Sequence, residues 1–220
     1  ILKKYGQKVF VIHFPGMAKK GGLQNVIILH FRINFSKFHR YIMHIDIDEF
    51  FCLKKHKSVK DLTKEYMIND TAALAFNWVF FGSNDLKMKE NKPVTERFTQ
   101  CQKGVDRHIK LLVDTHKLVL YKGCHFIYSR PNTYTKDTKG KIIKDLFNPD
   151  GDNSIGQINH YKVKSEEEFR KIVMRPRPDA VISDPNKMWR TNFDLEFPKY
   201  NFNEIEELTA KNFYQSLFIL

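Results

Sequence analysis

The 220-residue sequence has few cysteines, glycines and prolines, and it has no long apolar run. Its cysteines, Cys52, Cys101 and Cys124, are scattered and form no CxxC pair. They argue against a disulfide framework or a zinc site and favour buried thiols in the cytoplasm. Ten Gly and eight Pro are too few for a collagen-like or low-complexity chain. Charges or histidines interrupt every apolar run well before the roughly 18 residues that cross a bilayer, so the sequence predicts no membrane span.

Positive charge and aromatic side chains are what the sequence has in quantity. Its 37 Lys and Arg against 25 Asp and Glu give a net charge of +12 and a pI near 9.5. Such an excess either solvates the surface or attracts phosphate, in a nucleic acid or in the diphosphate of a small donor. A hydrophobic content of 42%, with 14% aromatic residues, suffices for a core. We therefore expect one domain over residues 1–220, with 172–220 as a C-terminal helical extension.

The first residue is Ile1 rather than Met, so we expect a segment upstream of it. A membrane anchor in such a segment would place the domain in a Golgi-type lumen, which is the alternative to the cytoplasm.

Apolar periodicity predicts an α/β fold. A β-rich run at 8–14 ends at Pro15-Gly16, helical spacing covers 23–38, and a strand rises at 41–45, which together form a strand, helix and strand. We expect a mixed, mostly parallel sheet flanked by helices. Further patterns predict a helix at 58–66 that starts with Ser58 as its N-cap, a core strand at 71–81, and short strands at 109–113, 117–121 and 125–128. The rest of the chain is expected to form a loop at 133–157, a helix after Tyr161 with a Ser165–Glu168 capping box, and an amphipathic helix at 203–218.

Acidic residues follow the strand at 41–45, in the run Asp46-Ile47-Asp48-Glu49. Where a strand gives way to a loop, two carboxylates two residues apart can converge on one divalent cation. Oxygen ligands suit Mg²⁺ or Mn²⁺, and ligands of open α/β sheets bind beyond the carboxyl ends of strands. The pattern therefore predicts a metal site at Asp46 and Asp48. The alternative is a solvated acidic turn.

The segment His44–Phe51 also resembles the DIDEF signature of the family-92 glycosyltransferases and their bacterial and viral relatives. The resemblance covers about residues 2–171, but the family's earlier strand, helix and second acidic loop have no counterpart here. Asp114 stands where the family often has another residue. Further segments are similar to the family's motifs and follow in its order: Trp78–Ser83, Val94–Phe98, Lys110–Val113, Gly123–Phe126 and Asn159–Lys171.

The resemblance implies a GT-A fold and a metal-dependent, inverting transfer of a sugar from a nucleotide diphosphate, with UDP favoured, to a glycan hydroxyl. Asp48 would bind Mn²⁺ or Mg²⁺ directly, and Asp46 would reach the metal or the ribose. A late histidine would complete the ligands, with His160 as first choice and His125 as second. The donor would contact Lys164, Lys110, Trp78 and Gly82.

An inverting transferase needs a carboxylate that takes the proton of the acceptor hydroxyl. Glu96 is the first candidate for this base, Asp85 the second and Asp152 a weaker third, while Glu49 would support the metal site. Each candidate also has a purely structural interpretation. The histidines could be hydrogen-bonded within the fold, the lysines could be solvated on the surface, the acids could form salt bridges, and Trp78 could belong to the core.

Two other classes of function compete. A nucleic-acid-binding module agrees with the charge of +12, but the sequence has no zinc-finger spacing, RRM motif or basic helix, so we expect no nucleic-acid partner. A metal-dependent phosphotransferase or nuclease would use the same paired Asp but needs further carboxylates for a second metal. A glycan-binding relative without activity would be expected to have lost one Asp of the pair.

Overall fold

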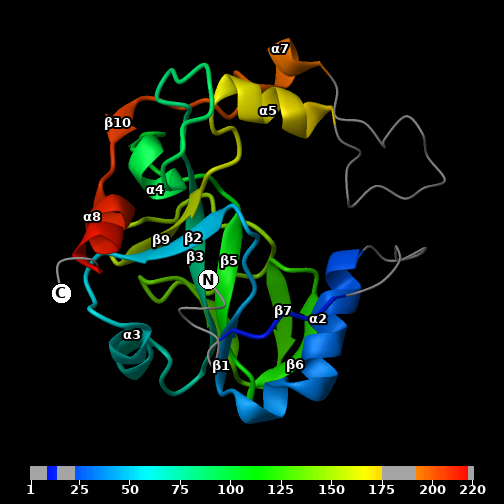
Figure 1. Ribbon diagram of the computed structural model, residues 1–220. Coiled ribbons are helices and arrows are strands. Elements are labelled where there is room, and N and C mark those ends of the chain that lie inside the picture. The colour runs from blue at the N-terminus through cyan, green and yellow to red at the C-terminus, as the bar shows by residue number, and fades with distance from the viewer. Residues whose placement is uncertain (1–8, 14–22, 175–191, 218–220) are drawn as a thin grey trace.

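The computed structural model describes residues 9–13, 23–174 and 192–217. Its centre is a six-stranded sheet with strands in the order β1-β5-β3-β9-β2, and β8 pairs with β3 as well (Figure 1). The strands are β1 (Tyr41–Met43), β2 (Glu49–Leu53), β3 (Thr71–Phe80), β5 (Ile109–Asp114), β8 (Tyr134–Lys136) and β9 (Gly156–His160). The predicted α/β class and the mixed character of the sheet are confirmed.

The prediction of a mostly parallel sheet is wrong. Only β3–β8 and β3–β9 are parallel, whereas β1–β5, β3–β5 and β2–β9 are antiparallel. The reason is β5, which runs back between β1 and β3 and pairs antiparallel with both. A strand's direction depends on the path of its connection, which the periodicity of a single strand does not encode.

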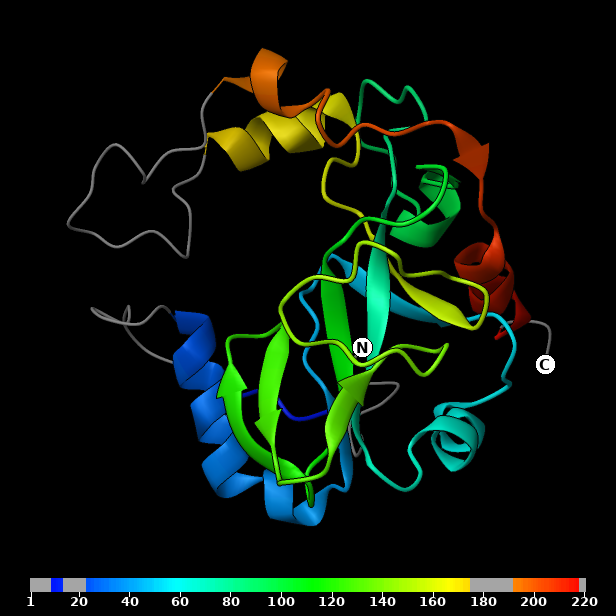
Figure 2. The ribbon, with the colours of Figure 1, turned by 180° about the vertical axis from the view of Figure 1, so that it is seen from behind.

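Apolar residues on both faces of β3 account for its central place. Every residue of this strand except Trp78 is buried, as expected of a strand covered on both sides. On one face, a cluster including Ala73, Ala75 and Leu111 packs near the hairpin β6 (Leu118–Lys122) and β7 (Phe126–Ser129). On the other, Leu74, Phe76 and Leu112 pack with Leu62 and Phe51. Leu62 belongs to α3 (Val59–Tyr66), and Figure 2 shows the arrangement from behind.

Local capping signals are confirmed. The Ser58 side chain accepts a hydrogen bond from the Asp61 backbone at the start of α3. Ser165 and Glu168 form a capping box at the start of α5 (Glu166–Val173). The predicted helix at 23–38 is α2 (Leu23–Asn34) followed by the 3₁₀ turn η2 (Ser36–Phe38). The remaining elements are β4 (Gln100–Cys101), α4 (Val94–Arg97), α7 (Phe193–Glu196), β10 (Ile205–Glu206) and α8 (Thr209–Ser216).

Four element predictions differ from the structure. Residues 9–13 form no strand and expose Phe10 and Val11, while the rest of the predicted 8–16 segment lies outside the described residues. The expected loop at 133–157 contains β8 and the start of β9. The helix predicted after Tyr161 begins later, because Lys164 has a φ of 58° and ends the preceding extended stretch. At 203–218 the helix is only α8, preceded by β10, and Phe218 is outside the described residues.

The part of the C-terminal extension within 192–217 packs against the rest of the domain. β10 pairs antiparallel with β4, and the Asn201 and Asn203 side chains accept hydrogen bonds from the backbone of Ser83 and Asn84. The described helices include none that is both long and apolar enough to cross a bilayer.

Candidate functional site

The strand directions bring the acidic loop to one edge of the sheet. β1, β3 and β9 run parallel to one another, so their carboxyl ends meet at this edge, and the antiparallel β5 and β2 begin there. Asp46 and Asp48 lie in the loop that joins β1 to β2. Glu49, the first residue of β2, stands opposite His160, the last residue of β9. The structure thus brings together residues that are more than 100 positions apart in the sequence.

Lys110 lies beneath the acidic loop and is fully buried. Its Nζ is 3.0 Å from Asp46 Oδ2 and 3.1 Å from Glu49 Oε2. Burial raises the pKa of Glu49 to about 7, although the charge of Lys110 opposes this. Burial alone would lower the pKa of Lys110, but the charge of Glu49 reverses the direction and raises it. Lys110 therefore orients the acidic loop, because its buried ammonium group forms ion pairs with the carboxylates of Asp46 and Glu49.

The backbone of the loop is also held in place. Glu49 Oε2 accepts a hydrogen bond of 2.9 Å from the Asp46 backbone N–H, and Gln24 Nε2 donates to Asp46 Oδ1 at 3.3 Å. Asp46 thus has both carboxylate oxygens in contact with α2 or Lys110. Glu49 Oε1, by contrast, is buried with no hydrogen-bond partner.

Asp48 and His160 face each other at this edge, with Asp48 Oδ2 3.8 Å from His160 Nε2. Burial, followed by the charge of Lys162, lowers the pKa of His160 to about 3. Its imidazole is therefore neutral at physiological pH and carries a lone pair. The Nδ1 atom is buried without a hydrogen-bond partner.

Trp78 is the centre of an aromatic cluster next to this pair. The indole stacks on His108 at 4.7 Å and meets His160 and His125 edge-on at 4.5 and 5.4 Å. Lys110 Nζ lies 5.9 Å from the ring centroid. His125 Nδ1 hydrogen-bonds the Ile109 carbonyl oxygen at 2.7 Å, which fixes the ring orientation, and burial lowers its pKa. A ligand that binds at Asp48 would therefore lie close to the aromatic rings of this cluster.

Five other predicted site residues lie outside the Asp48–His160 pair. A Cβ on Gly82 would come within 2.3 Å of the Phe202 carbonyl oxygen, so this glycine serves close packing against the C-terminal segment. Asp85 is exposed in the loop after β3 and accepts a hydrogen bond from Asn203 Nδ2. Glu96 is half-buried on α4. Lys164 occupies the bend before α5, and Asp152 pairs with Lys139 at 2.8 Å.

Arg97 does not orient its neighbour Glu96. Its guanidinium forms a bidentate pair with Glu168, at 2.6 and 3.1 Å. Since Glu168 also closes the capping box of α5, this pair ties α4 to α5.

Two site residues were missed by sequence reasoning, His108 and His44. His108 stands just before β5, where the turn that precedes a strand at this edge would have been the signal. His44 follows β1, and its Nε2 is buried without a hydrogen-bond partner.

The donors at the sheet edge that could hold a divalent cation are the Asp48 carboxylate and the His160 imidazole. Within 9–13, 23–174 and 192–217, no three His, Cys, Asp or Glu side chains are grouped to hold a metal. Asp48 and His160 nevertheless bring one carboxylate oxygen and one imidazole nitrogen to the same place. Adjacent ligand atoms of an octahedral cation are about 3.0 Å apart, so their 3.8 Å separation would have to shorten by a side-chain adjustment on binding. Mg²⁺ is commonly bound through one or two carboxylates together with substrate phosphates and water, so the Asp48 carboxylate would already be a sufficient protein contribution.

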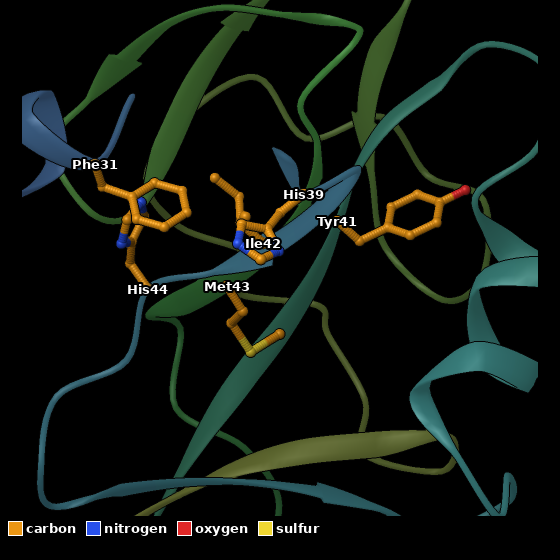
Figure 3. A pocket seen from close by; sticks show the side chains of 6 residues that line it. All are labelled: Phe31, His39, Tyr41, Ile42, Met43 and His44. Atoms are coloured by element: carbon orange, nitrogen blue, oxygen red, sulfur yellow. The ribbon is translucent and has the colours of Figure 1, made fainter. Parts of the chain in front are cut away.

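A separate cavity of about 370 Å³ adjoins β1 and α2. Figure 3 shows Phe31 and His44 close together, with Tyr41 pointing away from them. The lining residues are Phe31, His39, Tyr41, Ile42, Met43 and His44. Of these residues, His44 lies nearest to the acidic loop in the sequence, two residues before Asp46.

Comparisons with models of known protein families and with curated proteins found no match. The resemblance to the family-92 glycosyltransferases therefore stays a prediction.

Proposed function

We propose that this chain is a metal-dependent glycosyltransferase with a GT-A-type fold. It would move a sugar from a nucleotide diphosphate, with UDP favoured, to a glycan hydroxyl with inversion. The observation that carries the proposal is the Asp48–His160 pair at the carboxyl edge of a mixed sheet, with ligand atoms 3.8 Å apart beside the ring of Trp78.

Asp48 and His160 would hold Mn²⁺ or Mg²⁺, with diphosphate oxygens and water at the other positions. A bound divalent cation neutralises the charge that develops on a diphosphate leaving group. The neutral state of His160 supports this role, because an imidazolium has no lone pair to offer a cation. Asp46, held by Lys110, would then face the metal water or the ribose.

The burial of Lys110 changes the role that we assign to it. A fully buried ammonium paired with Asp46 and Glu49 is a positioning group for the acidic loop rather than a direct contact to phosphate. Trp78 would bound the sugar site, since aromatic faces pack well on the apolar faces of sugars, and its buried Nε1 has no partner of its own.

The positions of Asp85 and Glu96 support a different order of the candidate bases. Asp85 is exposed and follows the carboxyl end of β3, which is the edge that carries Asp48. Glu96 lies on α4, beside the Arg97–Glu168 pair. We therefore place Asp85 first and Glu96 second as the group that takes the acceptor proton.

The test is a panel of nucleotide sugars, scored with and without Mn²⁺ by thermal stabilisation and donor hydrolysis. We expect a nucleotide sugar to stabilise the chain only with Mn²⁺. Asp48→Asn should lose roughly 100-fold in donor turnover while unfolding as the wild type does. The matched control is Asp61→Asn on α3, which precedes the opposite end of β3 and should leave turnover unchanged.

Two outcomes would reject the proposal. Stabilisation by oligonucleotides alone would support a nucleic-acid module. Phosphate release from nucleotides or nucleic acids, with no sugar transferred or hydrolysed, would support a phosphotransferase or nuclease that uses the same Asp48.

A further inference from the structure

The positive charge of the chain is concentrated ahead of the acidic loop. Asp46 is the first acidic residue in the sequence, so residues 1–45 contribute +8 of the net +12. The eight basic residues are Lys3, Lys4, Lys8, Lys19, Lys20, Arg32, Lys37 and Arg40. A long stretch with one sign of charge marks a surface for an anionic partner.

The helix in this stretch exposes apolar side chains. Val26, Leu29 and Ile33, spaced i, i+3 and i+7 on α2, lie on one helix face and are 41%, 50% and 66% exposed. Phe38, the last residue of η2, is also apolar and is 69% exposed. We call these four residues the outer stripe.

The opposite side of α2 provides its attachment to the fold. Ile28 is buried, and Phe31 packs on the core cluster around Ile42, with His44 edge-on to its ring. Figures 1 and 2 both show α2 beside the hairpin of β6 and β7 at one side of the molecule. The core contacts of α2 therefore do not account for the outer stripe.

Basic groups accompany the outer stripe. Lys37 lies next to Phe38, with Nζ 5.0 Å from the ring centroid, and Arg32 and Arg40 flank η2 in the sequence. Two acids described near this region are paired: Asp46 with Lys110, and Asp114 with Arg40 at 3.5 Å.

We propose that the outer stripe and its flanking basic residues dock this protein on the surface of an anionic lipid bilayer. A helix that presents apolar residues next to Lys and Arg lies in the plane of the interface, with its apolar side among the acyl chains and its cations at the headgroups. Each Lys or Arg near such a surface adds about fivefold to the affinity. Residues 1–45 carry positive charge and no acidic residue. This favours an anionic bilayer over a second copy of the chain, because the equal positive charge of a second copy would repel the first. The inference does not depend on the transferase activity.

The test is co-sedimentation of the full chain with two kinds of vesicle, phosphatidylcholine alone and phosphatidylcholine with phosphatidylserine. We expect binding to the second kind only, weakened by salt because the charges are screened. Ile33→Ser should weaken binding by about tenfold. Met88→Ser is its matched control, since Met88 is 65% exposed against 66% for Ile33, and it should bind as the wild type does.

Charge is tested in the same way. Lys37→Glu should weaken binding by at least about fivefold, while Lys57→Glu, which makes the same change on an exposed lysine elsewhere, should have a much smaller effect. Absence of binding to both kinds of vesicle overturns the proposal, as do equal losses in a variant and its control. A concentration-dependent dimer that Ile33→Ser abolishes, without vesicle binding, would assign the outer stripe to a second copy and also overturn it.

Discussion

At the sheet edge charged groups are buried, whereas along the outer side of α2 apolar groups are exposed. Lys110 and Glu49 are inaccessible at the first place, and Ile33 and Phe38 are more than half exposed at the second. The buried charges are compensated within the chain, because Lys110 contacts two carboxylates. The exposed apolar side chains have no such compensation in the described residues.

Buried charges and exposed apolar side chains both depart from the usual distribution, but only the buried charges are explained by contacts among the described residues. Removing charges from water costs free energy even when they are paired, so the sheet edge is a site built at a cost to stability. Exposing a row of apolar side chains costs the folded chain little relative to its unfolded state, but it leaves a surface that a partner can cover. The first region therefore predicts chemistry and the second predicts attachment.

Removal of the buried ammonium group of Lys110 is expected to have the largest effect on the free energy of unfolding. Lys110→Met leaves Glu49 and Asp46 without their counter-charge, so the free energy of unfolding should fall by about 3 kcal/mol at pH 8. Urea denaturation measures this. Adding Glu49→Gln should restore part of the loss, because the buried negative charge is then gone.

Lys57→Met is the control for Lys110→Met, and it should change the free energy of unfolding by less than about 0.5 kcal/mol. Equal stability of Lys110→Met and wild type at pH 8 would contradict a buried ion pair at the sheet edge.

The second largest effect on stability is expected for the side of α2 that packs against the core. Ile28 is 4% exposed, so Ile28→Ala should lower the free energy of unfolding by about 2–3 kcal/mol through lost burial and a cavity. Urea denaturation monitored by circular dichroism measures it. A loss below about 0.5 kcal/mol would show that α2 is not anchored to the core through this residue.

The third effect is a pH dependence that His44 produces. Burial, followed by the charge of Lys110, lowers its pKa to about 4. The unfolded chain therefore binds a proton that the folded chain does not between about pH 6.5 and 4, and stability falls as the pH falls through this window. The contribution is about 1–2 kcal/mol between pH 7 and 5.

His44→Phe removes this proton uptake, since Phe31 and Tyr121 already surround the ring. The difference in unfolding free energy between wild type and variant should change in favour of the variant as the pH is lowered. Glu49, whose pKa is raised to about 7, acts in the opposite direction in both proteins and cancels in the difference. A difference that is constant between pH 7 and 5 would contradict a lowered pKa for His44.

The smallest effect on stability is expected for Ile33→Ser, which compares the exposed side of α2 with its buried side. Ile33→Ser, on the outer stripe, should change the free energy of unfolding by less than about 0.5 kcal/mol, even though the same substitution is expected to weaken vesicle binding. A loss as large as that of Ile28→Ala would mean that Ile33 belongs to the core.

Much of the fold could be predicted from the sequence where the signal is local. The buried run of β3, the Ser58 cap of α3 and the capping box of α5 each depend on residues within one turn or one strand. The strand expected at 8–14 failed in its described part, 9–13, because a β-rich run forms a strand only if a neighbouring edge pairs with it.

The candidate site was predicted in part. Asp46 and Asp48 could be predicted from their place after an apolar strand. His160 was predicted through the family resemblance, because the pattern predicted a loop where β9 begins. The partner of Lys110 could not be predicted, because its contact with Asp46 depends on β1 lying beside β5. Nothing in the local sequence distinguishes this lysine from the others of the chain except its apolar neighbours.

The sequence by itself determined the periodic elements, the helix caps, the acidic loop and the uneven charge, because each is a property of residues close together in the chain. The tertiary structure decided the strand directions, and through them which groups share the sheet edge. Ion pairs and pKa values depend on distance through space and on burial, so the pairing of Lys110, the neutral state of His160 and its approach to Asp48 appear only once the strands are in place.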